Sequence, residues 1–166
     1  MNILARLDTL GYEFQIMLHI VSVAAWVGSI IALTLGAQNA LKGGAPAIAS
    51  FATLAKTLNM KVKSAAFVLL FISGFGLVFG SRPEGADEMF WSMGDPFVSM
   101  GMAAVIVGGA IGGMIHAPAA RDLEVAANAG KLDEAKKLMG KMSLGNGIEI
   151  VLVLIALFMM VTARQG

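Results

Sequence analysis

Three ionisable side chains lie within long apolar stretches of the sequence and are the first candidates for chemistry. They are His19, His116 and Glu149. An ionisable group inside an apolar segment is costly to bury, so it is a functional candidate by default. Cysteine is absent, which excludes disulfides, thiolate catalysis and iron–sulfur clusters. The chemistry of this chain must therefore use imidazole, carboxylate and thioether groups.

His19 begins a stripe of polar and aromatic side chains. Ser22, Trp26 and Ser29 follow it at steps of three and four residues. In a helix such residues share one face, and a polar face is expected to point into a bundle. Two interpretations stay open for His19. It is either a neutral histidine hydrogen-bonded to a serine or a carbonyl, or a ligand for a metal or haem.

Methionine supplies candidate partners for His19. Of the 12 methionines, Met102 and Met160 fall at about the depth of His19, roughly one turn inside the expected outer membrane surface. Histidine and methionine are a known axial pair for haem, and both suit Cu(I). The alternative is that these methionines merely fill the membrane core. The interpretation we test makes His19 the main ligand, Met102 or Met160 the second ligand, and Trp26 a neighbour of the site.

His116 and Glu149 form a second candidate pair. They lie near facing ends of two helices expected to be antiparallel, and so at similar depth. The pair could relay protons, or the carboxylate could orient the imidazole; alternatively, both groups lie near the interface and reach water. His19 and His116 differ in expected height by roughly 20 Å. They therefore cannot ligate one metal or haem iron together.

The elements that position these residues are predicted to be membrane-spanning helices. Hydrophobic residues make up 57% of the 166 and charged residues 14%, against about 25% charged in soluble domains. A spanning helix needs about 20 mostly apolar residues. Four stretches qualify, at 14–37, 62–80, 97–117 and 144–162. The predicted fold is a single all-α domain, a four-transmembrane-helix bundle.

Basic residues predict the orientation of this bundle. Nine of the 12 lie in or beside the connections on one side: Lys42, Lys56, Lys61, Lys63, Arg121, Lys131, Lys136, Lys137 and Lys141. Basic residues near span ends mark the cytoplasmic face. We therefore expect a multi-pass protein of the bacterial inner membrane with both termini in the periplasm. The net charge of +1 gives no field that would attract nucleic acid.

The connections on the basic side are predicted to be helical. Residues 46–58 could form an amphipathic interfacial helix, and residues 119–142 a cytoplasmic helical hairpin turning at Gly130. The third span also holds two overlapping pairs of small residues, Gly108 with Gly112 and Gly109 with Gly113. Such pairs allow close helix packing in lipid. They serve either packing within the chain or contact with a second copy or another membrane subunit.

Three short motifs are spread along the chain: Leu18-His19 followed by Trp26-Val27-Gly28, Ile115-His116 followed by Pro118 and Arg121, and Leu144-Gly145-Asn146-Gly147 followed by Met160 and Arg164. With these motifs the chain resembles a family of bacterial four-helix membrane proteins. This family includes the membrane domain of copper-resistance protein D, uncharacterised relatives and the membrane-bound protoporphyrinogen oxidases. The resemblance to the oxidases implies a haem b ligand at His19. The resemblance to the copper branch implies copper handling through histidine and methionine.

The function predicted from the sequence is binding of haem b or copper by a small membrane protein in redox or metal traffic. The residues show no nucleophile–base pair, phosphate loop or paired carboxylates, so they give no positive indication of an enzyme. Two alternatives remain. One is a non-catalytic subunit of a larger membrane complex, and the other is an enzyme similar to the protoporphyrinogen oxidases.

Overall fold

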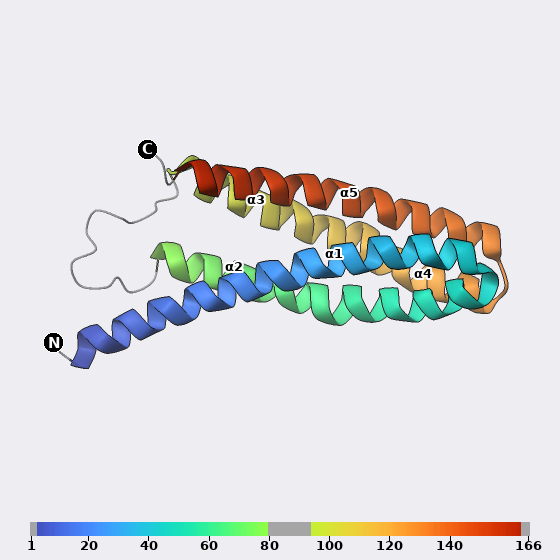
Figure 1. Cartoon of the computed structure of the whole chain (residues 1–166), viewed down its shortest axis with the longest axis horizontal. Coiled ribbons are helices and arrows are strands. Elements are labelled where there is room, and N and C mark those ends of the chain that lie inside the picture. The colour runs from blue at the N-terminus through green and yellow to red at the C-terminus, as the bar shows by residue number, and fades with distance from the viewer. Residues whose placement is uncertain (1–2, 80–93, 164–166) are drawn as a thin grey trace.

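The structure, a computed structural model, describes residues 3–79 and 94–163, nearly all of them helical. The elements in order are α1 (Ile3–Thr57), the π-helical segment η1 (Leu58–Lys63), α2 (Ser64–Phe79), α3 (Pro96–Ile111), the π-helical segment η2 (Gly112–His116), α4 (Ala117–Asn128) and α5 (Leu132–Ala163). Figure 1 shows them as a long bundle. The predicted all-α class is confirmed, and no strand occurs within the described ranges.

The chain reverses direction inside α1. Gly44 has φ 74° and ψ −161°, a backbone region that is essentially limited to glycine. Pro46 follows, where its fixed φ suits the first turn of the returning helix. The reversal divides α1 into a first arm, residues 3–43, and the start of a second arm, residues 45–79, which runs back through η1 and α2 (Figure 1).

The other half of the bundle is a second antiparallel pair. The third arm, residues 96–128, runs without a break through α3, η2 and α4, and the fourth arm is α5. Gly130 has φ 72° and lies in the short turn between them. Helical backbone therefore covers the predicted stretches 97–117 and 144–162 and extends past their ends, and the predicted hairpin 119–142 is helical on both sides of the turn at residues 129–131.

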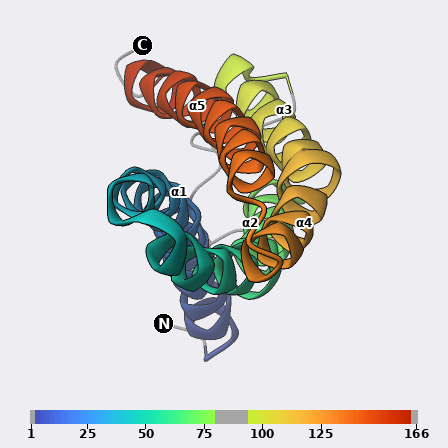
Figure 2. The same cartoon turned by 90° about the vertical axis from the view of Figure 1, so that its right-hand side faces the viewer.

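Both reversals lie at the same end of the bundle, which we call the turn end; the opposite end, where N and C are marked, is the terminal end (Figure 1). Figure 2 looks onto the turn end and shows the second arm beside α4. An apolar core fills this end, formed by Leu33, Ala40, Ile48, Phe51, Ala52, Ala55, Ala119, Ala120, Leu123, Ala126, Ala135, Met139 and Met142. Residues 46–58 contribute to this core, so they pack within the bundle instead of lying apart as the predicted interfacial helix.

A second apolar core lies toward the terminal end, and it is formed by Trp26, Ile30, Ala66, Leu70 and Val153. Outside it, large apolar side chains face away from the bundle, among them Phe14, Ile72 and Phe158, each more than half exposed. In the part of the chain that the structure describes, three helical stretches are long and apolar enough to cross a membrane: Gly11–Phe79, Pro96–Asn128 and Leu132–Thr162. The first of them contains the reversal at Gly44.

The glycine pairs of the third arm face two directions. A Cβ at Gly108 would lie 2.8 Å from the Trp26 ring and 2.9 Å from the Phe67 ring. A Cβ at Gly109 or Gly113 would meet nothing within 4 Å. Gly108 therefore serves packing within the chain, because a side chain there would displace two aromatic rings.

The reversal at Gly44 gives a test of the fold. Gly44→Ala should lower the free energy of unfolding by about 1–3 kcal/mol, the cost of placing a side chain in this backbone region. The control is Gly140→Ala in α5, where a Cβ meets nothing within 4 Å and removing a helical glycine should stabilise by about 0.5–1 kcal/mol. Unfolding of the purified protein in detergent measures both, and equal stability of the two variants would contradict the reversal.

Candidate functional site

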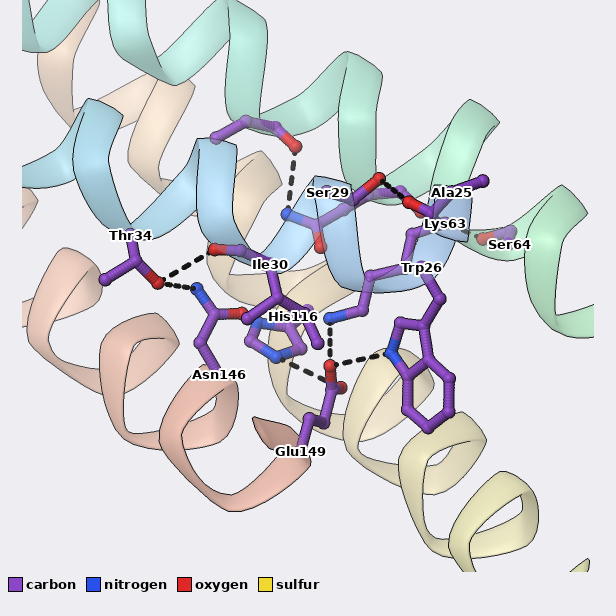
Figure 3. A network of polar contacts seen from close by, with 12 residues as sticks. Ala25, Trp26, Ser29, Ile30, Thr34, Lys63, Ser64, His116, Asn146 and Glu149 are labelled. Carbon is purple, nitrogen blue, oxygen red and sulfur yellow. Dashed lines mark hydrogen bonds and ion pairs between the residues drawn. The ribbon is translucent and has the colours of Figure 1, made fainter. Parts of the chain in front are cut away.

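Glu149 is the centre of a polar cluster inside the bundle, and its side chain is 0% exposed. Its Oε2 lies 2.5 Å from Lys63 Nζ and accepts a hydrogen bond from Trp26 Nε1 at 3.1 Å. Its Oε1 lies 3.4 Å from His116 Nε2. Figure 3 shows the three side chains converging on the carboxylate. We call Glu149, Lys63, His116 and Trp26 the Glu149 cluster.

Each arm of the bundle contributes one member of this cluster. Trp26 comes from the first arm, Lys63 from the second, His116 from the third and Glu149 from the fourth. Lys63 and His116 are the last residues of the two π-helical segments η1 and η2. A π-helical turn is rare and is frequent at functional sites. Here the two turns deliver the cation and the imidazole to the same carboxylate.

Two asparagines extend the polar layer around the cluster. Asn59 donates to the carbonyl of Ala55 at 2.9 Å, and Asn146 donates to Thr34 Oγ1 at 3.5 Å. Within the described part of the chain, Asn59 Oδ1, Asn146 Oδ1 and His116 Nδ1 are buried without a hydrogen-bond partner. Unpaired buried polar atoms of this kind are the usual partners of internal water. The layer therefore has the chemistry to hold water next to His116.

Close packing fixes the position of the imidazole and the indole. A Cβ at Gly145 would lie 2.9 Å from both Cε1 and Nε2 of His116, so only glycine leaves room for the ring there. The Trp26 and Phe67 rings pack with centroids 4.6 Å apart, over Gly108. The cluster is thus held by the surrounding backbone as well as by its own polar contacts.

The positive charge of Lys63 offsets the negative charge of Glu149. Removing Lys63 and Glu149 from water costs several kcal/mol for each ion, and their mutual attraction with further hydrogen bonds offsets that cost only in good geometry. The carboxylate accepts a hydrogen bond from Trp26 and has Lys63 and His116 within ion-pair distance. Histidine beside a carboxylate can exchange a proton with it, so the buried cluster has the groups that acid–base exchange requires.

The structure brings together one pair that the sequence suggested. His116 and Glu149 are in contact and both are 0% exposed, so neither reaches water as the interfacial alternative requires. Trp26, expected beside His19, donates its N–H to Glu149 and so belongs to this cluster. Whether these residues relay protons stays a prediction.

Sequence reasoning missed Lys63 as a member of the site. Lys63 is among the nine basic residues on which the predicted orientation rests, yet its side chain is 2% exposed. Its position just inside the predicted span 62–80 was the available signal. The neighbouring Lys61 is exposed, so charge and position alone did not separate the two lysines.

His19 lies apart from this cluster and contacts α2. Its Nδ1 is 3.2 Å from Ser73 Oγ, and Ser73 Oγ in turn donates to the carbonyl of Leu70 at 3.2 Å. Because the hydroxyl proton is used in that bond, the network assigns the hydrogen of His19 to Nδ1. Its Nε2 then carries the free lone pair, as in histidines that bind metals.

Met160, one of the two methionines proposed as partners of His19, contacts α3. Met160 Cε lies 3.4 Å from a Cβ built on Gly101 of α3, one residue before Met102. Met160 therefore packs on α3, whereas His19 packs on α2. Among the described residues, no group of three or more His, Asp or Glu side chains could hold a metal ion; a histidine–methionine site is a different arrangement.

Comparisons with protein-family models, curated proteins and solved structures find no match to this chain. The resemblance to the bacterial four-helix family therefore stays a prediction.

The ion pair gives a test of the cluster. Lys63→Met and Glu149→Gln should each destabilise the protein by about 3–5 kcal/mol, because each leaves one charge buried without its partner. The double variant should lose much less than the sum, since it buries neither charge. Unfolding in detergent measures the three variants, and additive losses would show that the two charges do not interact.

Proposed function

We propose that this chain is an integral membrane protein with four spans, whose Glu149 cluster takes up and releases a proton in support of a redox or metal centre at His19. The observation that carries the proposal is the fully buried Glu149 in contact with Lys63, His116 and Trp26. Ionisable side chains grouped inside an apolar bundle are characteristic of proton relays and ion pathways in membrane proteins.

The lengths of the helices support four spans. The stretch Gly11–Phe79 has 69 residues and would extend about 100 Å if it were straight, far more than the ~30 Å hydrocarbon core. The reversal at Gly44 divides it into two arms that could each cross. Exposed basic residues at the turn end, such as Lys42, Lys131 and Lys137, support a cytoplasmic turn end and periplasmic termini in a bacterial inner membrane.

The chemistry at Glu149 balances as a simple proton transfer. A protonated His116 can pass its proton from Nε2 to Oε1 of Glu149, which leaves a neutral imidazole and a neutral carboxyl group. Lys63 then lacks its counterion, so the proton is held only briefly and returns or moves on. The buried pair thus favours rapid exchange over storage of the proton.

His19 is the residue best suited to hold the accompanying centre. Its Nδ1 contact with Ser73 supports a free Nε2 that would bind haem b or copper. Met102 or Met160 would be the second ligand. The thioether of Met160 packs against α3 and would have to turn toward His19. Haem bound there would supply electron transfer. If the electrons came from a porphyrin substrate, the protein would be a porphyrin-oxidising enzyme.

The alternative function is that of a non-catalytic subunit. The pair Gly109 and Gly113 is exposed and meets nothing within 4 Å, which supports contact with a second copy or another subunit through this face of the third arm. In this alternative the Glu149 cluster would only hold the four arms together.

Infrared difference spectra between two pH values test proton exchange at the cluster. The wild-type spectrum should contain a carboxyl band that is absent in Glu149→Gln. Gly145→Ala should shift this band, because its Cβ would displace the His116 ring. The matched control is Gly147→Ala, whose Cβ meets nothing within 4 Å and which should leave the band in place. A wild-type spectrum unchanged by Glu149→Gln would contradict the proposal.

Visible spectra and metal analysis of the detergent-purified protein test the centre at His19. A Soret band or stoichiometric copper should be lost in His19→Ala. Ser73→Ala keeps the imidazole but removes its hydrogen-bond partner, and should weaken binding by about 10–100-fold. A colourless, metal-free protein that co-purifies with other subunits would favour the subunit alternative, and a protein soluble without detergent would contradict the membrane assignment.

A further inference from the structure

The polar surroundings of the Glu149 cluster differ between its two sides. We propose that protons reach the cluster from the turn end, through Thr34 and Asn146, and that the Trp26–Phe67 ring pair closes it toward the terminal end. This inference rests on the proposed proton exchange and adds to it a direction of access.

A trail of polar groups leads from the cluster toward the turn end. Asn146 precedes Glu149 by three residues on α5 and so lies on the same face. Its amide donates to Thr34 Oγ1 at 3.5 Å, and Figure 3 shows its side chain between Thr34 and His116. Thr34 is partly exposed, and Gln38, one turn further toward the turn end, is exposed. The trail therefore connects the buried imidazole to the surface of the first arm.

The unpaired atoms along this trail indicate how a proton would cross it. Asn146 Oδ1 and His116 Nδ1 are both buried and lack a hydrogen-bond partner among the described residues. An amide oxygen and a ring nitrogen on one face of the bundle can be bridged by internal water, which typically makes about three hydrogen bonds. A water at this position would link Asn146 to His116, and protons move along such hydrogen-bonded links.

The opposite side of the cluster is apolar and closely packed. The Trp26 and Phe67 rings lie 4.6 Å apart, and Gly108 packs against both so closely that a Cβ there would be within 3 Å of each ring. Ala66, Leu70 and Val153 continue the apolar core toward the terminal end. Ala66, Leu70 and Val153 offer water no polar partners, so a proton path past the rings would have to run through the serines of the first and second arms.

Serine hydroxyls offer the competing route toward the terminal end. Ser22 Oγ donates to the carbonyl of Leu18 at 2.7 Å, and Ser73 Oγ donates to that of Leu70 at 3.2 Å. Each hydroxyl hydrogen is thus held by the backbone of its own helix. Thr34 Oγ1 likewise donates to the carbonyl of Ile30, at 2.8 Å, but it also accepts a hydrogen bond from Asn146, whereas Ser73 is bonded to His19.

Exchange of the His116 ring proton for deuterium tests the route. The chain has two histidines, so ¹⁵N-histidine labelling gives ring signals from His19 and His116 only, and a His19→Gln spectrum assigns them. Thr34→Val and Asn146→Leu should each slow exchange at His116 by about tenfold or more, as expected from about 1.4 kcal/mol added to a barrier. The matched controls Ser22→Ala and Ser73→Ala should leave the rate unchanged.

The closure is tested in the same assay. Phe67→Ala opens space beside Trp26, so adding it to Thr34→Val should restore fast exchange at His116. The route would be overturned if the serine variants slowed exchange at His116, or if Thr34→Val and Asn146→Leu did not slow it. The closure would be overturned if Phe67→Ala failed to restore fast exchange. These outcomes are separate from the infrared test. If the route were overturned while the Glu149 carboxyl band behaved as expected, the proposed proton exchange at Glu149 would still hold.

Discussion

The ion pair between Lys63 and Glu149 is the interaction on which the rest of the bundle depends. Both charges are almost fully buried, where either one alone would be strongly destabilising. The second and fourth arms must therefore lie in the one register that brings the two groups together. Trp26 and His116 add contacts to the same carboxylate, so the register of the first and third arms is tied to it as well.

The helices depart from regular α-helical geometry beside the ion pair. The two π-helical segments end at Lys63 and His116, and Gly145 leaves space for the imidazole. Irregular turns and glycines weaken a helix on their own account. Their concentration around one carboxylate indicates that the polar cluster, more than helix stability, determined the local structure of these arms.

The polar layer also separates two apolar cores with different surroundings. The core at the turn end is built largely of alanine and lies beside exposed basic residues, whereas the core toward the terminal end contains the aromatic pair Trp26 and Phe67. His19 belongs to the terminal half and Glu149 to the boundary between the halves.

The sequence by itself determined the helical class, the apolar stretches and the candidates His116 and Glu149, because composition and residue spacing act locally along a helix. Only the tertiary structure decided that Lys63 is buried while Lys61 is exposed, and that the Trp26 indole N–H donates to Glu149. Both outcomes depend on the reversal at Gly44 and on the π-helical turns, which rotate side chains relative to partners far away in the chain. A prediction from sequence periodicity treats each helix as regular, so it does not detect such a rotation.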